Sequence, residues 1–273
     1  MSRCVLLLLF VLFGAPQEDV QRSVRELLRK LRSDQVEERA EAQKKLQEIG
    51  APAILELAKA VQDSDADYAA RAAALLKAIS LDADAMHNPG APVLLRPAPD
   101  RFKIRYTTSA GDFTVKVVRA WAPNGADRLH GLVRIGYFTD CRFFRVVSGF
   151  MCQFGIHGDP GVSVKWKGAV IPDDPVKESN KEGRVTFAMR GPRTRTTQLF
   201  VNLKDNAFLD DQGFAPVGEI VDGMDVVRRI YADYGEGAPQ GKGPDQVKIL
   251  SGGNAYLADF PKLDFIRKAE IVD

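Results

Sequence analysis

The sequence predicts a protein of two parts, an N-terminal array of helical hairpins followed by an all-β domain closed as a barrel. Between residues 19 and 81 apolar residues recur every three or four positions, as they do on amphipathic helices. Beyond residue 101 apolar and polar residues alternate, which is typical of strands with one buried face. We therefore expect a helical domain at residues 17–82, a proline-rich linker at 83–100 and a β domain at 101–273.

The first 16 residues have the pattern of a signal peptide. Arg3 precedes about nine uncharged apolar residues, and Gly14-Ala15-Pro16 follows them. A helix needs roughly 20 apolar residues to span a bilayer. The sequence therefore predicts an exported protein, periplasmic or secreted, with no stable membrane span after cleavage. A short buried N-terminal strand is the alternative.

Overall composition argues against several classes of function. The 38 basic and 36 acidic residues nearly cancel, so no long-range field favours nucleic acid or an anionic membrane. His87, His130 and His157 share no metal-ligand spacing, and we expect neither a metal nor a cofactor. In an exported protein Cys141 and Cys152 could pair, but two buried free thiols are the favoured interpretation.

The helical part contains a weak internal repeat. After thirty residues the spacing of Ala42, Leu46 and Ile49 returns as Ala72, Leu76 and Ile79. This recurrence resembles a pair of HEAT-type repeats, and a plain four-helix bundle is the alternative. Either arrangement would serve as an interaction module for a protein partner.

The β part begins with an expected hairpin of residues 102–106 and 113–117. Helices are predicted around Leu129 and at 224–231, and a last strand at 265–272. Several strands with only two helices imply a β-barrel closed at its ends.

One segment, CRFFRVVSGFMCQFG at residues 141–155, places a single arginine among large apolar side chains. A strand, turn and strand would put Phe143, Arg145 and Val147 on one face of the first strand. The second strand would carry Phe150, Met151 and Gln153. A guanidinium beside such a surface can hydrogen-bond a carbonyl while the apolar side chains hold a proline ring.

This segment resembles the cyclophilin signature F-H-R-V-I-x-G-F-M-x-Q-G-G. A second segment about fifty residues on, GPRTRTTQLF at 191–200, is similar to that family's G-P-N-T-N-G-S-Q-F-F. A third block, residues 208–224, is similar to W-L-D-G-K-H-V-V-F-G-x-V-x-x-G-M. The resemblance covers about residues 101–273. It implies a closed, eight-stranded antiparallel barrel capped by two helices, and peptidyl-prolyl cis-trans isomerase activity.

The resemblance also implies roles for individual residues. Arg145 would donate a hydrogen bond near the prolyl nitrogen, and Gln153 would fix the orientation of Arg145, so these two are the expected catalytic residues. The expected substrate-binding residues are Phe150, Met151, Ala188, Met189, Gln198, Phe200, Phe208, Leu209 and Phe214. The substrates would be proline-containing polypeptides, in particular unfolded or loop X-Pro segments of other exported proteins.

The chain departs from the family pattern on one side of the expected groove. Met189 replaces an asparagine or threonine, while Arg193 and Arg195 replace two asparagines and predict a more basic rim. The glycine-rich run at 235–243 lacks the order of a phosphate-binding loop and is interpreted as a plain loop. Two other functions remain open: a proline-peptide-binding chaperone, or a helical-repeat adapter, each with little turnover.

Overall fold

The computed structural model describes residues 15–272 and divides the chain into two compact units, Met1–Asp84 and Ala85–Asp273. The predicted signal peptide lies outside the described residues, except for the start of the first helix at Ala15. Among the helices that the structure describes, none combines the length and the apolar character that crossing a membrane requires.

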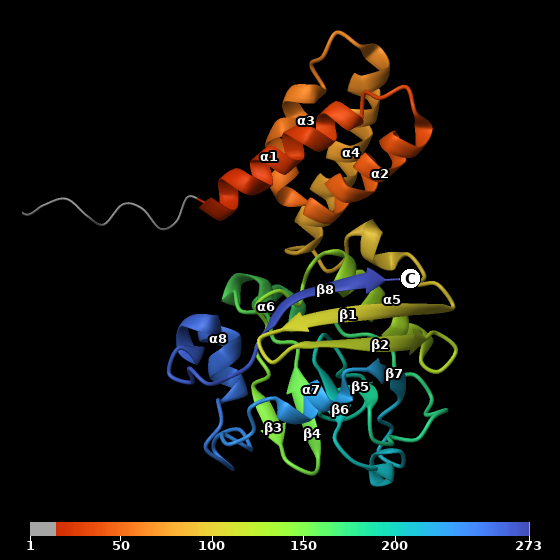
Figure 1. Cartoon of the computed structure of the whole chain (residues 1–273). Helices are drawn as coiled ribbons and strands as arrows, with labels where there is room; N and C mark the ends of the chain where they lie inside the picture. Colours follow the sequence, from red (N-terminus) through yellow and green to blue (C-terminus); the bar gives the residue numbers. More distant parts are fainter. Residues whose placement is uncertain (1–14, 273) are drawn as a thin grey trace, which may run out of the picture. The chain divides into compact units, whose positions relative to one another are not determined.

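The first unit is entirely helical (Figure 1). Its elements are α1 (Ala15–Lys30), α2 (Val36–Ile49), the 3₁₀ turn η1 (Ala51–Ala53), α3 (Ile54–Ala60) and α4 (Ala66–Ala85). Gly50, at φ +68°, ends α2, because a left-handed residue cannot continue the helix. Asp65 accepts a hydrogen bond from the backbone N–H of Tyr68 (3.0 Å) and so caps α4. One buried apolar cluster, from Val24 to Ile79, joins these helices.

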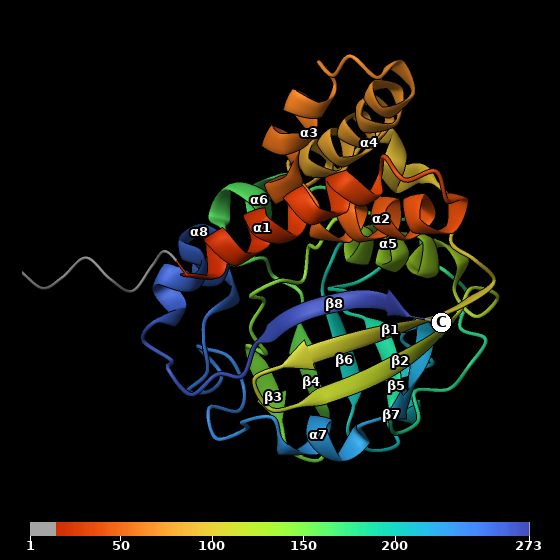
Figure 2. The same cartoon turned by 45° about the horizontal axis from the view of Figure 1, so that its top comes forward.

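The second unit is built on one antiparallel sheet that curls around the main core (Figure 2). Its strands are β1 (Arg101–Thr108), β2 (Asp112–Val118), β3 (Arg145–Val147), β4 (Met151–Phe154), β5 (Arg184–Phe187), β6 (Leu199–Asn202), β7 (Pro216–Asp222) and β8 (Ile266–Val272). They lie in the order β3-β4-β6-β5-β7-β2-β1-β8. The expected hairpin is confirmed: β1 and β2 pair Phe102 with Val117 and Tyr106 with Phe113, and these side chains are buried.

The sheet is an open half-barrel, so the prediction of a closed barrel is wrong. β3 and β8 are the two edge strands of the sheet. The residues just before them, Arg142 and Phe265, pair through one isolated antiparallel bridge. β3 has only three residues, and it forms a ladder with β4 alone. Backbone hydrogen bonds, such as the one from the N–H of Phe143 to the carbonyl of Asp264 (2.9 Å), also link the segments before the two edge strands.

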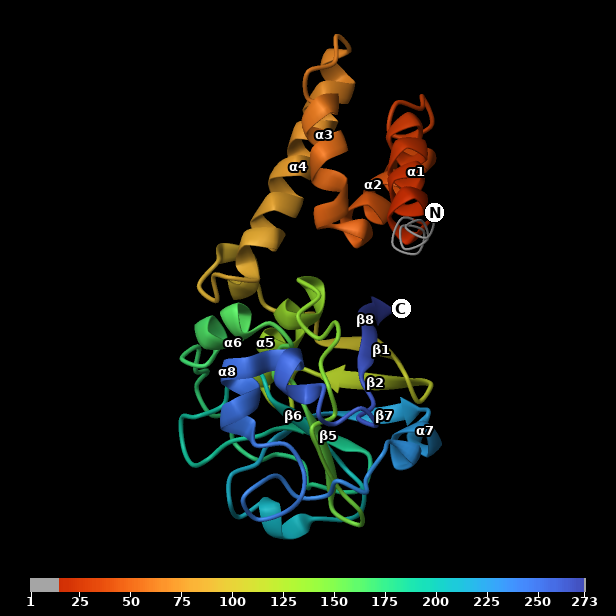
Figure 3. The ribbon, with the colours of Figure 1, turned by 90° about the vertical axis from the view of Figure 1, so that its left-hand side faces the viewer.

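Both expected helices are present, as α5 (Pro123–Arg134) and α7 (Met224–Arg229), and they lie on opposite sides of the curled sheet (Figure 2). Sequence periodicity missed α6 (Pro160–Trp166) and α8 (Gln246–Leu257), which pack against each other (Figure 3). α8 contains a Gly-Gly pair and a kink at Gly253, and α6 has just seven residues. Such short or interrupted helices give a weak periodic signal.

Residues 86–100 belong to the second unit and pack against the rest of it. The turn η2 (Pro92–Leu95) contacts α5, and Leu94 lies against the main core. The carbonyl of Met86 accepts a hydrogen bond from Trp166 Nε1 (2.8 Å), and Asp127 accepts one from the N–H of Ala98 (2.8 Å).

Cys141 and Cys152 are two buried free thiols, which confirms the favoured interpretation over a disulfide. Burial raises the pKa of both thiols, because an apolar interior disfavours the thiolate. Neither side chain has the exposed, electropositive surroundings of a reactive cysteine.

Candidate active site

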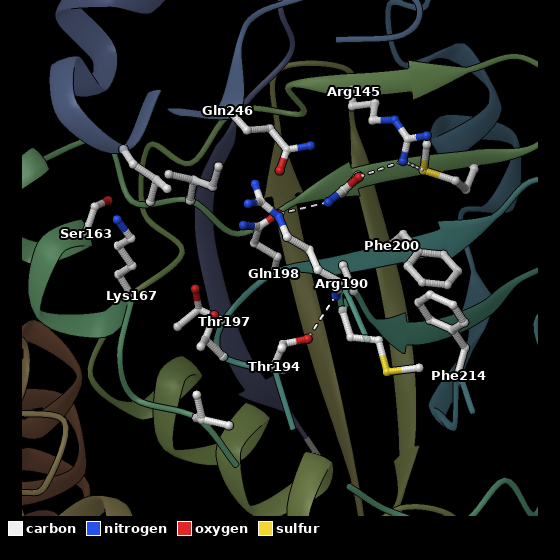
Figure 4. A pocket seen from close by; sticks show the side chains of 18 of the residues that line it. Arg145, Ser163, Lys167, Arg190, Thr194, Thr197, Gln198, Phe200, Phe214 and Gln246 are labelled. Carbon is white, nitrogen blue, oxygen red and sulfur yellow. Dashed lines mark hydrogen bonds between the residues drawn. The ribbon is translucent and has the colours of Figure 1, made fainter. Parts of the chain in front are cut away.

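A pocket of about 480 Å³ lies where β3, β4 and β6 meet the loop after β5 (Figure 4). The strand register brings its central residues together: β3 pairs Arg145 with Gln153, and β4 pairs Gln153 with Phe200. Because side chains alternate along a strand, Val146 and Cys152 face the main core while Arg145 and Gln153 face the pocket.

Phe143 does not share the face of Arg145, contrary to the hairpin prediction. The strand begins only at Arg145, so alternation does not extend back to Phe143. Its ring instead packs in the main core, 5.3 Å from the ring of Phe154.

A chain of side-chain hydrogen bonds crosses the pocket. Arg145 Nη1 donates to Gln153 Oε1 (3.1 Å), and Gln153 Nε2 donates to Gln198 Oε1 (2.9 Å). The Gln153 amide thus links the side chains of Arg145 and Gln198. Since Gln153 is 5% exposed, its amide has little freedom to turn, and it presents its oxygen to the guanidinium.

Beside this chain lies an apolar hollow. Met151, Phe200 and Leu209 form a buried cluster, against which Phe150, Ala188 and Phe214 pack. The rings of Phe200 and Phe214 meet edge to face at 5.8 Å. The Met151 sulfur lies 4.0 Å from Arg145 Nη1, so the guanidinium borders the hollow directly. A hollow of this kind can hold a small apolar ring next to a hydrogen-bond donor.

The structure brings all but one of the predicted site residues into this pocket, namely Arg145, Gln153, Phe150, Met151, Ala188, Met189, Gln198, Phe200, Leu209 and Phe214. Phe208 is the exception, because it is 54% exposed and does not line the cavity. In the 3₁₀ turn η3 (Ala207–Leu209), Leu209 is buried while Phe208 stacks on the ring of Phe150 at 6.0 Å.

The predicted basic rim is real but consists of other residues. Arg195 is 1% exposed and ion-paired with Asp174 (3.1 Å), and Arg193 is exposed without lining the pocket. Instead, Arg190 and Lys167 line it, and Gln246 at the start of α8 joins them. The sequence could not show that Arg190 lines the pocket while Arg195 is buried, because burial of a charged residue depends on partners distant in the chain.

Glu236 is the residue that sequence reasoning missed most completely. Its carboxylate accepts hydrogen bonds from Arg145 Nε (2.5 Å) and Nη2 (2.7 Å). The hydrogen bond from Arg145 lowers the pKa of Glu236 below its usual value. Glu236 lies 91 residues after Arg145 in the glycine-rich run, and no local motif marks it.

A network of buried asparagine side chains is hydrogen-bonded to the backbone of the apolar hollow. Asn202 Nδ2 donates to Asn180 Oδ1 (3.2 Å), and Asn202 Oδ1 accepts from Asn206 Nδ2 (2.8 Å). Asn206 Nδ2 also donates to the carbonyl of Phe150 (2.9 Å), which fixes the backbone at the turn between β3 and β4. All three asparagines are fully buried.

The pocket offers hydrogen-bond donors and an apolar surface but no metal-ligand set. Within residues 15–272, no cluster of three or more His, Cys, Asp or Glu side chains could hold a metal ion. The guanidinium beside the apolar cluster suits chemistry that needs binding and a positioned donor.

Comparison with known proteins gives a consistent result for this part of the chain. The model of the family "Cyclophilin type peptidyl-prolyl cis-trans isomerase/CLD" matches residues 102–253. Peptidyl-prolyl cis-trans isomerase B of Escherichia coli is 32% identical over 141 residues, which are 46% of this chain and 82% of that protein. The isomerase cyp18 of Streptomyces antibioticus is 32% identical over 137 residues, 46% of this chain and 81% of that protein.

Among solved structures, a cyclophilin-type isomerase of Cryptosporidium parvum aligns with a TM-score of 0.47 at 19% identity, covering 63% of this chain and 98% of that one. The family model and the sequence relatives confirm the predicted enzyme class. The chain belongs to the cyclophilin-type peptidyl-prolyl cis-trans isomerase family.

Proposed function

We propose that this chain isomerises X-Pro bonds in polypeptides by stabilising the twisted transition state with the guanidinium of Arg145. The observation that carries the proposal is the position of Arg145 Nη1, between the Gln153 oxygen (3.1 Å) and the Met151 sulfur (4.0 Å) at the edge of the apolar hollow. A donor therefore stands where a proline ring seated in the hollow would present its nitrogen.

The physical requirement is to weaken amide resonance. Rotation about a peptide bond costs about 18–20 kcal/mol, because the C–N bond has partial double-bond character. As the prolyl nitrogen becomes pyramidal during rotation it gains a lone pair, and a donor aimed at that lone pair stabilises the transition state more than the ground state. Glu236 leaves one N–H group of Nη2 free to meet the substrate, and the second N–H of Nη1 faces the Met151 sulfur (4.0 Å), a weak acceptor that a substrate atom can replace.

Replacing the donor tests this proposal. We expect Arg145→Ala to reduce kcat/KM for a short X-Pro peptide about 100-fold, or about 2.7 kcal/mol, as expected for one transition-state donor. Arg193→Ala is the matched control, because Arg193 is an exposed arginine outside the pocket. Equal rates for wild type and Arg145→Ala would contradict the mechanism. Peptide binding without turnover in the wild type would instead indicate a proline-binding chaperone.

For the first unit we propose a protein-binding role, as a HEAT-like pair of helical hairpins. Two equivalent positions of the repeat, Ala42 and Ala72, are both fully buried. At the other two pairs, Leu46 and Ile79 are buried while their equivalents Leu76 and Ile49 are half-buried. Cross-linking of the full chain in its own cells, followed by peptide mapping, tests this role. Partner cross-links within residues 19–81 are expected, whereas cross-links confined to the pocket would argue for a single substrate-binding function.

We further propose that the protein is exported and acts on X-Pro segments of other exported proteins. The proposal rests on the charge pattern of residues 1–16, with Arg3 before an uncharged apolar run. Mass spectrometry of the mature N-terminus, combined with cell fractionation, tests it. An intact Met1 on protein retained inside the cell would overturn the proposal.

A further inference from the structure

We infer that Glu236 is a positioning residue of the isomerase site, which holds the guanidinium of Arg145 in its working orientation. The inference rests on the proposed role of Arg145 and adds a residue from outside the three matching sequence blocks. It follows from the two-point contact between the carboxylate and the guanidinium, and from the loop that fixes the carboxylate.

The contact is bidentate and uses one edge of the guanidinium. Nε donates to Glu236 Oε1 (2.5 Å) and Nη2 donates to Oε2 (2.7 Å). Two parallel charge-assisted hydrogen bonds define the plane of the guanidinium as well as its position, which one bond cannot do. Gln153 engages the opposite end at Nη1, so the group is held from both sides.

The loop after α7 is built to present this carboxylate. The backbone oxygen of Glu236 accepts a hydrogen bond from Gly243 (2.8 Å), and the N–H of Gly237 donates to the side-chain Oε1 (2.9 Å). At Gly241 a Cβ atom would stand 2.3 Å from the backbone oxygen of Glu236, closer than any side chain allows. The glycine-rich composition of this run is therefore a requirement of a tight loop around Glu236.

Both ends of the loop are anchored in the second unit. Before it, the ring of Tyr234 meets Phe260 edge to face at 5.2 Å. After it, Asp245 caps α8 by accepting from the N–H of Val247 (2.7 Å), and its own N–H donates to Tyr256 Oη (3.0 Å). The backbone that carries Glu236 is consequently fixed at both ends, and the N–H of Gly237 and the guanidinium of Arg145 hold its carboxylate, whose side chain is 40% exposed.

This arrangement has a consequence for catalysis. Arginine has several rotatable bonds, and a guanidinium held only by Gln153 could turn about its long side chain. A donor already in place when the prolyl nitrogen becomes pyramidal avoids reordering during the reaction. Removing the carboxylate should therefore lower kcat and leave ground-state binding in the hollow largely intact.

The kinetic test is Glu236→Gln in the full chain, assayed with a short X-Pro peptide. We expect kcat to fall about tenfold with KM within about twofold of wild type, because the loss concerns orientation in the transition state. Glu182→Gln is the matched control, since Glu182 also pairs with an arginine, Arg228 (2.7 Å), but at an exposed place outside the pocket.

The outcomes separate this inference from the proposed function. An inactive wild type would overturn the role of Arg145 itself. If the wild type is active and Arg145→Ala is not, an unchanged or raised kcat in Glu236→Gln would overturn the positioning role. A rise in KM alone would do the same, because it would make Glu236 a substrate-binding group.

A measurement on the wild type keeps the test valid if the variant folds poorly. The ¹⁵N–¹H signal of Arg145 Nε, assigned by its loss in Arg145→Lys, should be observable at neutral pH, since Glu236 shields that proton from exchange. Among the described residues, Arg145 is the charged group that acts on the Glu236 carboxyl. The chemical shift of this signal should change as acidification protonates Glu236, and a shift indifferent to that step would refute the contact.

Discussion

The two sides of the pocket are held in different ways. The strand side, defined by Arg145, Met151, Gln153 and Phe200, comes from β3, β4 and β6. The helix side, defined by Ser163, Lys167, Arg190 and Gln246, comes from α6, the loop after β5 and the start of α8. Figure 4 shows Arg145 and Phe200 at one end, with Lys167 and Ser163 at the other.

The difference lies in what fixes each side chain. On the strand side, Met151, Gln153 and Phe200 are buried, and Arg145 is hydrogen-bonded at both ends. On the helix side, Lys167 and Arg190 are exposed, and neither has an acidic ion-pair partner within the described part of the chain. The strand side is therefore held in one arrangement, whereas Lys167 and Arg190 on the helix side are free to respond to the charges of a substrate.

The largest expected effect concerns the support of the strand side. Asn202→Ala removes one of the two acceptors of Asn206 Nδ2, leaving it the carbonyl of Phe150, and it removes the side-chain donor to the carbonyl of Arg184. We expect the free energy of unfolding to fall by about 3 kcal/mol, as for loss of a buried hydrogen-bond network. Urea unfolding followed by tryptophan fluorescence reports on this unit alone, because Trp121 and Trp166, the chain's only tryptophans, both lie in it.

Gln212→Ala is the control for that measurement. Gln212 is an exposed amide that donates to the carbonyl of Phe208 (3.3 Å), close to the same pocket. Its removal should change the free energy of unfolding by less than about 0.5 kcal/mol. Similar losses for the two variants would mean that the buried amides contribute no more than surface contacts, and the contrast between the two sides would lose its structural basis.

A smaller effect is expected on the helix side. Arg190→Glu should lower kcat/KM about fivefold for a peptide with an acidic residue next to the X-Pro pair, and leave an uncharged peptide nearly unaffected. The expected change is about 1 kcal/mol because the group is exposed and water screens its charge. Raising the salt concentration should reduce the difference between the peptides.

Arg193→Glu makes the same charge change on an exposed residue outside the pocket. If it discriminates against the acidic peptide as strongly as Arg190→Glu, the effect comes from overall charge and not from the helix side. An equal loss for both peptides in Arg190→Glu would place Arg190 in the catalytic machinery instead.

The strand side could be predicted from sequence, whereas the helix side could not, and the reason is physical. Arg145, Phe150 and Gln153 lie within nine residues of each other, so one hairpin fixes their relation and a local motif records it. Lys167 and Gln246 line the same pocket only because α6 packs against α8. Glu236 could not be predicted for the same reason, since its contact with Arg145 depends on a loop 91 residues further along the chain.

The same distinction explains the error in the fold. Alternation predicted the β1–β2 hairpin, and the short turn between its strands sets the register that the structure shows. Closure of the barrel depends on whether β3 finds β8 after more than a hundred intervening residues, and no local pattern encodes the three-residue length of β3. Local rules therefore predicted the hairpins and the last strand but not the edge where the sheet stays open.

The smallest expected effect concerns the charged end of the amide network. Asp210 accepts hydrogen bonds from Ser179 Oγ (2.6 Å) and Asn180 Nδ2 (2.8 Å). Burial raises the pKa of Asp210, but these hydrogen bonds outweigh it and hold that pKa below its usual value. A carboxyl with a lower pKa in the folded state stabilises the protein above its unfolded pKa of about 3.9, and loses this contribution as the pH falls through the folded value.

We therefore expect the free energy of unfolding of the wild type to exceed that of Asp210→Asn at neutral pH, and the two curves to converge below about pH 4. The difference at neutral pH should be about 0.5 kcal/mol, because Asp210 is partly exposed and water screens its charge. Asp211→Asn, an exposed neighbour, should show no such convergence. A difference for Asp210→Asn as large as that for Asn202→Ala would mean that the charge, and not the buried amides, holds the strand side in place.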